Sequence, residues 1–183
     1  MIIFYYIQIP SQSNGIYVKS NLNGKEYFVQ NLDGNEEAAD MLASINNRIF
    51  TLREYLLKNI DKYPEYRTYN MQFCDRISKL ILTENNPTGK YTSYTVNKGD
   101  EIALCLRSKK TGKLHDINLV MYVVLHELSH VACPEIDHTE LFKKIFILYL
   151  QIASNLGIYE NINYKLNPSE YCGLTINENL LKN

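Results

Sequence analysis

The sequence predicts an α+β fold in which helices pack around a small, mostly antiparallel sheet. Two segments, residues 16–30 and 91–108, have the alternation and central turns of β-hairpins, and long stretches between and after them have helical periodicity. Of the 183 residues, 45% are hydrophobic and 21% are charged, which is ordinary for a globular protein. We therefore expect one domain over residues 1–183.

Residues 1–32 are expected to form N-terminal strands. The opening "MIIFYYIQIP" is interpreted as a first strand or an apolar docking segment. It is shorter than the roughly 20 apolar residues of a membrane span, and it lacks the basic region and cleavage site of a signal peptide. Residues 16–30 follow as a hairpin around Asn23 and Gly24, a pair typical of the type I′ turn, which needs positive φ at both positions.

Residues 33–82 are expected to be helical. Apolar residues recur every three or four positions in "AADMLASINNRIFTLREYLLKNI", which places them on one helical face. Asp33 or Asn35 can cap this helix. Pro64 opens a second predicted helix, over residues 64–82.

Residues 90–177 are expected to form the core that carries function. A hairpin is predicted to turn at residues 98–100, and its second arm, residues 102–106, is nearly all apolar, as in a strand covered on both faces. Two helices follow, over residues 119–132 with Asp116 or Asn118 as the cap and over residues 139–156 before Gly157. The tail from residue 163 shows no regular period.

The segment "VVLHELSHVACPEIDHTELF", residues 123–142, contains three of the four histidines of the chain. On a helix, His126 and His130 project from the same face, about 40° apart, which is the geometry two imidazoles need to bind one zinc ion. Glu127 lies about 100° around from His126 and can take a proton from a water beside the metal. The pattern therefore predicts a catalytic zinc site.

The flanks of the motif favour the same interpretation. No charged residue other than Glu127 occurs between Leu119 and Ala132, so the helix is expected to be buried. Buried polar groups need partners, and a metal satisfies two histidines at once. The alternative is a pair of core histidines bonded to backbone carbonyls, with Glu127 in an ion pair.

A catalytic zinc site has three protein ligands and leaves one position for water. Pro134 disfavours helix at Cys133, so the chain turns there, and His138 at the start of the next helix is the expected third ligand. His138 could instead be a surface residue at the helix start. Three carboxylates compete for the ligand role: Glu135, Glu140 and Glu170.

The segment "VVLHELSHVA" matches the extended zinc-metallopeptidase signature at every position, and "HTELF" resembles the third-ligand block of the WLM and SprT-like families. Further similarity to metallopeptidase-like proteins of large DNA viruses occurs in "KYTSYTVNKGDEIALCLRS", "GIYENINYKLNP" and "EYCGLTI", so the resemblance covers roughly residues 90–177. It implies a zincin-like protease whose active-site helix packs against a sheet. One departure is clear, because seven residues without glycine separate His130 from His138 where the familiar pattern HExxHxxGxxH has five.

These observations predict a metallopeptidase with one catalytic Zn²⁺ held by His126, His130 and His138, and with Glu127 as general base. The resemblance places the substrate backbone on an edge strand formed by Ile102, Ala103 and Leu104, although an internal strand there is the alternative.

Three further residue types carry weaker predictions. Tyr171 is a candidate for stabilising the substrate oxyanion, against a buried structural role. His115 could be a second proton donor. The cysteines, Cys133 and Cys172 included, are expected to be reduced thiols of an intracellular protein that is not secreted, although these two could bind zinc or act as redox switches.

Two alternative functions share the predicted site. Several proteins of the resembled families cleave DNA–protein crosslinks, and Lys109, Lys110 and Lys113 with Arg107 are the one basic cluster that could contact DNA; a solvated hairpin tip explains them as well. The net charge of −1 gives no general attraction to nucleic acid. The second alternative is a zinc-binding regulatory module with little turnover.

Overall fold

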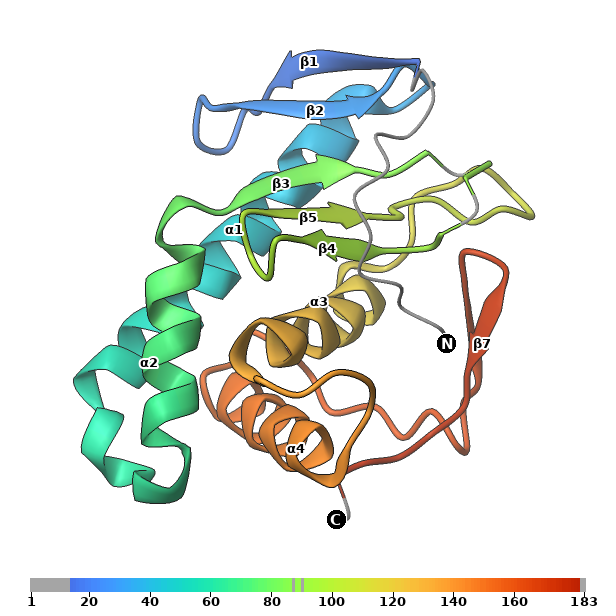
Figure 1. Ribbon diagram of the computed structural model, residues 1–183. Helices are drawn as coiled ribbons and strands as arrows, with labels where there is room; N and C mark the ends of the chain where they lie inside the picture. Colours follow the sequence, from blue (N-terminus) through green and yellow to red (C-terminus); the bar gives the residue numbers. More distant parts are fainter. Residues whose placement is uncertain (1–13, 87, 90, 182–183) are drawn as a thin grey trace.

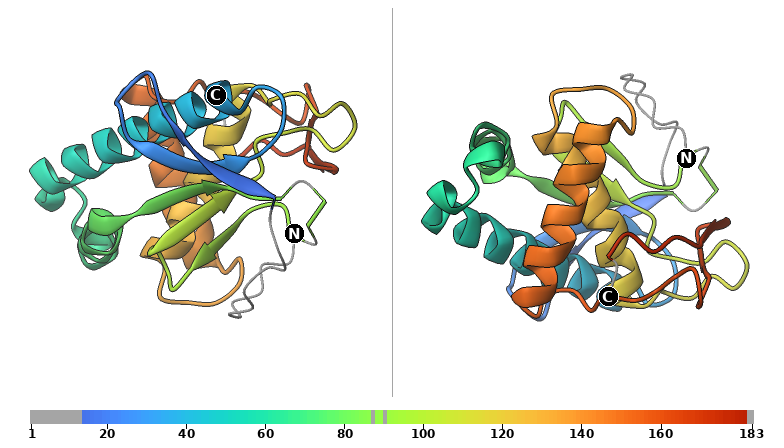
Figure 2. Two further views of the ribbon diagram at one scale, coloured as in Figure 1. Left: turned by 90° about the horizontal axis from the view of Figure 1, so that it is seen from above. Right: turned by 90° about the horizontal axis from the view of Figure 1, so that it is seen from below.

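The computed structural model describes residues 14–86, 88–89 and 91–181, and it confirms the predicted α+β class. In the views of Figures 1 and 2, the helices lie on one side of a five-stranded sheet. The segment "MIIFYYIQIP", predicted to be a strand or a docking segment, lies outside the described residues. A search of the described residues for an apolar helix of membrane-spanning length found none.

The main sheet has the strand order β1-β2-β3-β5-β4, and a separate hairpin pairs β6 with β7. Antiparallel pairs predominate, because β1–β2, β4–β5 and β6–β7 are antiparallel whereas β2–β3 and β3–β5 are parallel. The strands are β1 (Gly15–Lys19), β2 (Glu26–Gln30), β3 (Ile81–Glu84), β4 (Tyr94–Val96), β5 (Glu101–Leu104), β6 (Ser169–Tyr171) and β7 (Leu174–Ile176).

Four α-helices occur in the described residues: α1 (Asn35–Lys58), α2 (Arg67–Arg76), α3 (Ile117–Ala132) and α4 (Glu140–Asn155). Helix α1 packs against β1, β2 and β3, and α3 packs against β4 and β5. Helix α4 covers the other side of α3, so that α3 lies between the sheet and α4 (Figure 1). Every residue of α3 from Leu119 to Ala132 is buried, as the uncharged sequence predicted.

The predicted hairpins are present, but the first turn differs from the expected type. In the β1–β2 connection only Gly24 has positive φ (71°), and the loop closes between Ser20 and Lys25, whose amide and carbonyl are 2.8 Å apart. The type I′ prediction was therefore wrong. At the β4–β5 turn Asn97, Lys98 and Gly99 all have positive φ.

The prediction of one helix over residues 64–82 was also wrong. Helix α2 ends at Arg76, a short 3₁₀ segment follows (Ile77–Lys79), and the apolar run after it becomes the central strand β3. Short apolar runs have no distinctive period, and here the parallel pairing with β5 decides the structure. The β6–β7 hairpin in the tail was likewise not predicted.

The predicted capping residues are confirmed for α3 and α4 but not for α1. Asp116 Oδ1 accepts hydrogen bonds from the amides of Asn118 and Leu119 at the start of α3, and Thr139 Oγ1 accepts one from the Phe142 amide in α4. Helix α1 begins after Gly34 (φ 76°) with no side-chain cap, so neither Asp33 nor Asn35 caps it.

Candidate metal centre

The three histidines of the segment 123–142 converge on one point. Their Nε2 atoms are 3.3 Å apart between His126 and His130, 3.2 Å between His130 and His138, and 3.0 Å between His126 and His138. Ligand nitrogens about 2.0–2.1 Å from a tetrahedral zinc ion are separated by about 3.3 Å. The three nitrogens therefore have the spacing of one face of a zinc tetrahedron, and these residues fit such an ion.

Two elements bring these histidines together. Helix α3 presents His126 and His130 one turn apart, and it ends because Cys133 is extended (ψ 127°) before Pro134. The loop that follows returns the chain to α3, with Asp137 at positive φ (69°) just before His138.

Phe142, in the first turn of α4, packs against all three imidazoles. Its ring is 4.1 Å from that of His130 in a stacked arrangement, 4.9 Å from that of His126 and 4.8 Å from that of His138. The side chain is almost fully buried. Phe142 therefore limits the rotation of the three rings and excludes water from one side of the cluster.

Burial keeps the histidines neutral. It is the largest cause that lowers the pKa of each ring, well below the ordinary value for His126 and to about 3 for His130. Their mutual repulsion when charged lowers the pKa of His126 and His130 further. Neutral imidazole is the form that binds a metal, so the electrostatics agree with the geometry.

Glu127 is buried beside this cluster on the same helix, with 1% of its surface exposed. Its Oε2 accepts a hydrogen bond from Thr95 Oγ1 in β4 at 3.0 Å. Burial raises the pKa of its carboxyl group to about 7, while the Thr95 hydrogen bond acts in the opposite direction. A carboxylate with a pKa near neutrality has the properties of a general base.

Helix α2 supports the end of α3 that carries His130. Arg76 Nη1 donates to the carbonyl of Val131 at 2.8 Å, and Gln72 Nε2 donates to the carbonyls of Val131 and Ala132. These carbonyls have no partner within the helix, and a cation there also complements the helix dipole. Neither contact could be predicted from the sequence, because both depend on the packing of α2 against α3.

The prediction of an edge strand at residues 102–104 was wrong, and the alternative of an internal strand is confirmed. Ile102, Ala103 and Leu104 belong to β5, which is hydrogen-bonded to β3 on one side and to β4 on the other. All three residues are buried. A strand paired on both sides cannot accept a further strand, and within residues 14–86, 88–89 and 91–181 the sheet edge beside α3 is β4.

Tyr171 and His115 lie in a separate buried cluster. The Tyr171 hydroxyl is 2.7 Å from Ser93 Oγ, and its ring packs 5.1 Å from the His115 ring. Burial raises the pKa of Tyr171, and the charge of Glu127 raises it further. His115 Nε2 accepts a hydrogen bond from the Cys172 amide. The hydroxyl of Tyr171 is therefore hydrogen-bonded to Ser93, the residue just before β4, and a structural role agrees with its surroundings.

The three competing carboxylates do not join the histidines. Glu140 is exposed and pairs with Lys143 at 2.8 Å. Glu170 accepts hydrogen bonds from Ser108 and from the amide of Gly173, and Glu135 is exposed. Among the described residues, the group suited to a metal ion consists of the histidines alone.

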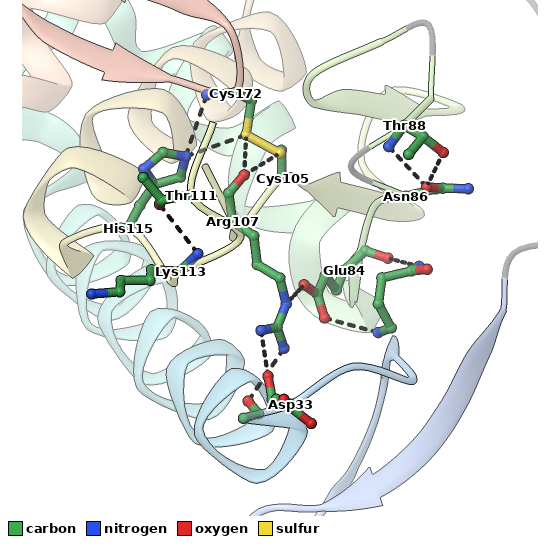
Figure 3. A network of polar contacts seen from close by, with 12 residues as sticks. Asp33, Glu84, Asn86, Thr88, Cys105, Arg107, Thr111, Lys113, His115 and Cys172 are labelled. Carbon is green, nitrogen blue, oxygen red and sulfur yellow. Dashed lines mark hydrogen bonds and ion pairs between the residues drawn. A yellow bond between two sulfur atoms is a disulfide. The ribbon is translucent and has the colours of Figure 1, made fainter. Parts of the chain in front are cut away.

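Cys105 and Cys172 form a disulfide, contrary to the expectation of four reduced thiols. Figure 3 shows this bond beside His115, with the Arg107 carbonyl oxygen 3.3 Å and 3.2 Å from the two sulfur atoms. The partners are 67 positions apart, so only the tertiary structure could reveal the pair. Cys74 and Cys133 are free and buried.

Arg107 does not belong to the exposed basic cluster that the sequence predicted. Arg107 is buried, and its Nε donates to Glu84 Oε1 at 2.8 Å (Figure 3). The same side chain donates to the carbonyls of Asp33 and Gly34 before α1. It therefore joins β3 to the start of α1 and is not available to DNA. Lys109 and Lys110 are exposed at the turn.

The fold and the site together define an α+β protein with a three-histidine cluster and a buried carboxylate on one helix. Its sequence is 58% identical to "Uncharacterized protein R325" of Acanthamoeba polyphaga mimivirus over 180 residues, which cover 98% of this chain and 91% of that protein. The chain belongs to the same protein family as this mimivirus protein.

A second relative, "Uncharacterized protein 136R" of Invertebrate iridescent virus 6, is 29% identical over 140 residues, 63% of this chain and 78% of that protein. A third, "Uncharacterized protein 042R" of Invertebrate iridescent virus 3, is 44% identical over 68 residues, 37% of this chain and 42% of that protein. No family model matches the chain, and no solved structure matches it. These names state no activity, so the resemblance to WLM and SprT-like peptidases stays a prediction.

Proposed function

We propose that this protein is a zinc-dependent metallopeptidase that hydrolyses peptide bonds. The observation that carries the proposal is the convergence of three histidine Nε2 atoms within 3.0–3.3 Å, on the helix that also holds the buried Glu127. His126, His130 and His138 would hold the ion. A bound zinc ion would polarise a carbonyl group and lower the pKa of a water molecule beside it.

Glu127 is the general base and then the general acid in this proposal. Its carboxylate takes a proton from the attacking water and later gives it to the leaving amine. The enclosed position of the side chain favours this task, because the proton is exchanged away from bulk solvent. A structural zinc site has no use for such a base, which weighs against the alternative of a regulatory module with little turnover.

The substrate in this proposal is an extended protein or peptide chain. In the part of the chain that the structure describes, β4 pairs with β5 alone, and it packs against α3, which carries two of the histidines and Glu127. An extended peptide can add to such an edge through main-chain hydrogen bonds. In this proposal the substrate backbone therefore binds to β4, in place of residues 102–104 in β5.

Action on DNA–protein crosslinks has less support. Without Arg107, the basic cluster is reduced to three lysines at an exposed turn, and a solvated turn explains them equally well. Loss of salt-dependent DNA binding on neutralising Lys109, Lys110 and Lys113 would favour that function. An intracellular site of action in a host cell is also part of the proposal, although the Cys105–Cys172 disulfide removes the reduced-thiol argument for it.

Metal analysis combined with a peptidase assay, with and without DNA, tests the proposal. Purified protein is expected to contain one equivalent of zinc and to cleave unfolded protein substrates. Glu127→Gln should keep the zinc and lose cleavage by about a hundredfold or more, since it removes the base. The matched control is Glu140→Gln, which changes an exposed carboxylate. Absence of zinc, or undiminished cleavage by Glu127→Gln, would refute the proposal.

A further inference from the structure

We infer that Thr95 is a positioning residue, which holds the carboxyl group of Glu127 in the orientation needed for proton transfer. The inference rests on the proposed function and names a residue outside the histidine motif. It also joins the candidate substrate strand directly to the general base, because Thr95 lies in β4.

The contact is short and enclosed. Thr95 Oγ1 donates to Glu127 Oε2 at 3.0 Å, and both residues are buried. A hydroxyl group has one proton to donate, so the Thr95 hydroxyl is committed to Oε2 and Oε1 is left to accept a proton. The hydrogen bond therefore distinguishes the two oxygens of an otherwise symmetric carboxylate.

The backbone of Thr95 is held by strand pairing with β5, on the side of β4 that faces the interior of the sheet. Thr95 is paired with Ile102 in the β4–β5 ladder, and its half-buried neighbours Tyr94 and Val96 point to the opposite face of the sheet. A β-branched side chain has restricted rotation about χ1. Both features reduce the freedom of the hydroxyl group.

Tyr171, which the sequence analysis considered as an oxyanion donor, contacts Ser93, the residue just before β4. Ser93 Oγ is 2.7 Å from the Tyr171 hydroxyl and accepts a hydrogen bond from the Cys105 amide at 3.1 Å. Tyr171 is adjacent to Cys172, whose disulfide with Cys105 joins the β6–β7 hairpin to the end of β5. Tyr171 thus acts on the site through the position of β4.

This arrangement gives the hydrogen bond a specific effect on the reaction. The Thr95 hydroxyl donates to the base, whereas the three histidine Nε2 atoms contact one another, so loss of the hydroxyl should leave the metal cluster intact. A misoriented base slows proton transfer and therefore lowers kcat. The edge of β4 that would bind the substrate is unchanged, so KM should stay the same.

The test compares Thr95→Val, which keeps the shape and removes the donor, with Thr95→Ser, which keeps the donor. Zinc content, kcat and KM are measured on the full chain with an unfolded protein substrate. Thr95→Val is expected to lower kcat by about tenfold or more, with KM within about twofold and zinc unchanged. Thr95→Ser should recover most of the loss. A crystal structure of Thr95→Val should show the Glu127 carboxyl group displaced.

Thr83→Val is the matched control, because Thr83 in β3 also donates to a carboxylate, that of Glu101, at 2.9 Å outside the site. It should leave kcat unchanged. Wild-type kcat in Thr95→Val, a lower kcat with loss of zinc, or an unmoved Glu127 carboxyl group would each overturn the inference. If Thr95→Val does not fold, Thr95→Ala carries the same expectations.

These readouts separate the inference from the proposed function. If wild-type protein cleaves no substrate, the peptidase proposal fails, and the crystal structure of Thr95→Val still decides whether Thr95 positions Glu127. If the wild type cleaves and Glu127→Gln does not, but Thr95→Val has normal kcat, then only the inference about Thr95 fails.

Discussion

The Nε2 atoms of His126 and His138 lie 3.0 Å apart, although the residues are twelve positions apart and belong to different elements. His126 is in the middle of α3, whereas His138 directly precedes Thr139, the capping residue of α4. The turn after Pro134 therefore brings His138 back to α3 across the seven residues that separate it from His130.

Replacement of His138 by Ala should abolish stoichiometric zinc binding. Two histidines on α3 are too few for a stable site, so the affinity should fall at least as much as the roughly 10–100-fold seen on loss of a supporting residue. Zinc content after dialysis against a mild chelator measures the effect. Glu140→Ala, one turn from the same loop, is the control and should bind zinc normally. Equal zinc retention by both variants would exclude His138 as a ligand.

Because of the disulfide, we expect two of the four cysteines to react with a thiol reagent. Under denaturing, non-reducing conditions, only Cys74 and Cys133 should react with a thiol reagent. Replacing Cys105 and Cys172 by Ser should lower the free energy of unfolding by about 4 kcal/mol, the loop-closure contribution for a separation of 67 residues. Denaturant unfolding measures it, with Cys133→Ser as the comparison. Four reactive thiols in the purified protein would contradict the disulfide.

Arg107→Met should destabilise the fold by about 3–5 kcal/mol, because Glu84 would remain buried without its cation. Adding Glu84→Gln to this variant should recover part of the loss. Burial already raises the pKa of Glu84, so in Arg107→Met the folded state binds a proton more readily than the unfolded state. The stability of this variant should therefore fall as pH rises from about 5 to 8. Denaturant midpoints across that range provide the measurement, and a pH-independent loss would argue against a buried unpaired carboxylate.

Gly99→Ala should destabilise the β4–β5 turn by more than Gly112→Ala destabilises its own. Both glycines have positive φ, which costs a non-glycine residue about 1–2 kcal/mol. A Cβ on Gly99 would also lie 3.0 Å from Val131 Cγ1 in the last turn of α3, whereas a Cβ on Gly112 meets nothing within 4 Å. Thermal and denaturant unfolding compare the two variants. Equal losses would show that the contact with α3 can relax.

Much of the candidate site was predictable from local sequence. The spacing of His126 and His130 fixes their common face on any helix, and the uncharged flanks indicated that α3 would be buried, as it is. Pro134 and Thr139 likewise indicated where one helix ends and the next begins. These features depend on residues within one or two turns of each other, so the chain itself carries them.

Contacts between distant segments were not predictable in this way. The predicted helix included the first two residues of β3, and an edge and an internal position were both open for β5, because a short apolar run does not specify its partners. The Cys105–Cys172 disulfide, the Arg107–Glu84 ion pair and the Thr95–Glu127 hydrogen bond join residues 67, 23 and 32 positions apart.

The sequence by itself determined the α+β class, the buried helix α3 and two of the three histidines that face the candidate metal position. Only the tertiary structure decided that His138 completes the cluster, that β4 is the edge strand among the described residues, and that Thr95 contacts the carboxyl group of Glu127. The physical reason is that helical periodicity and capping are local properties of the backbone. Strand order and side-chain contacts instead depend on how the whole core packs.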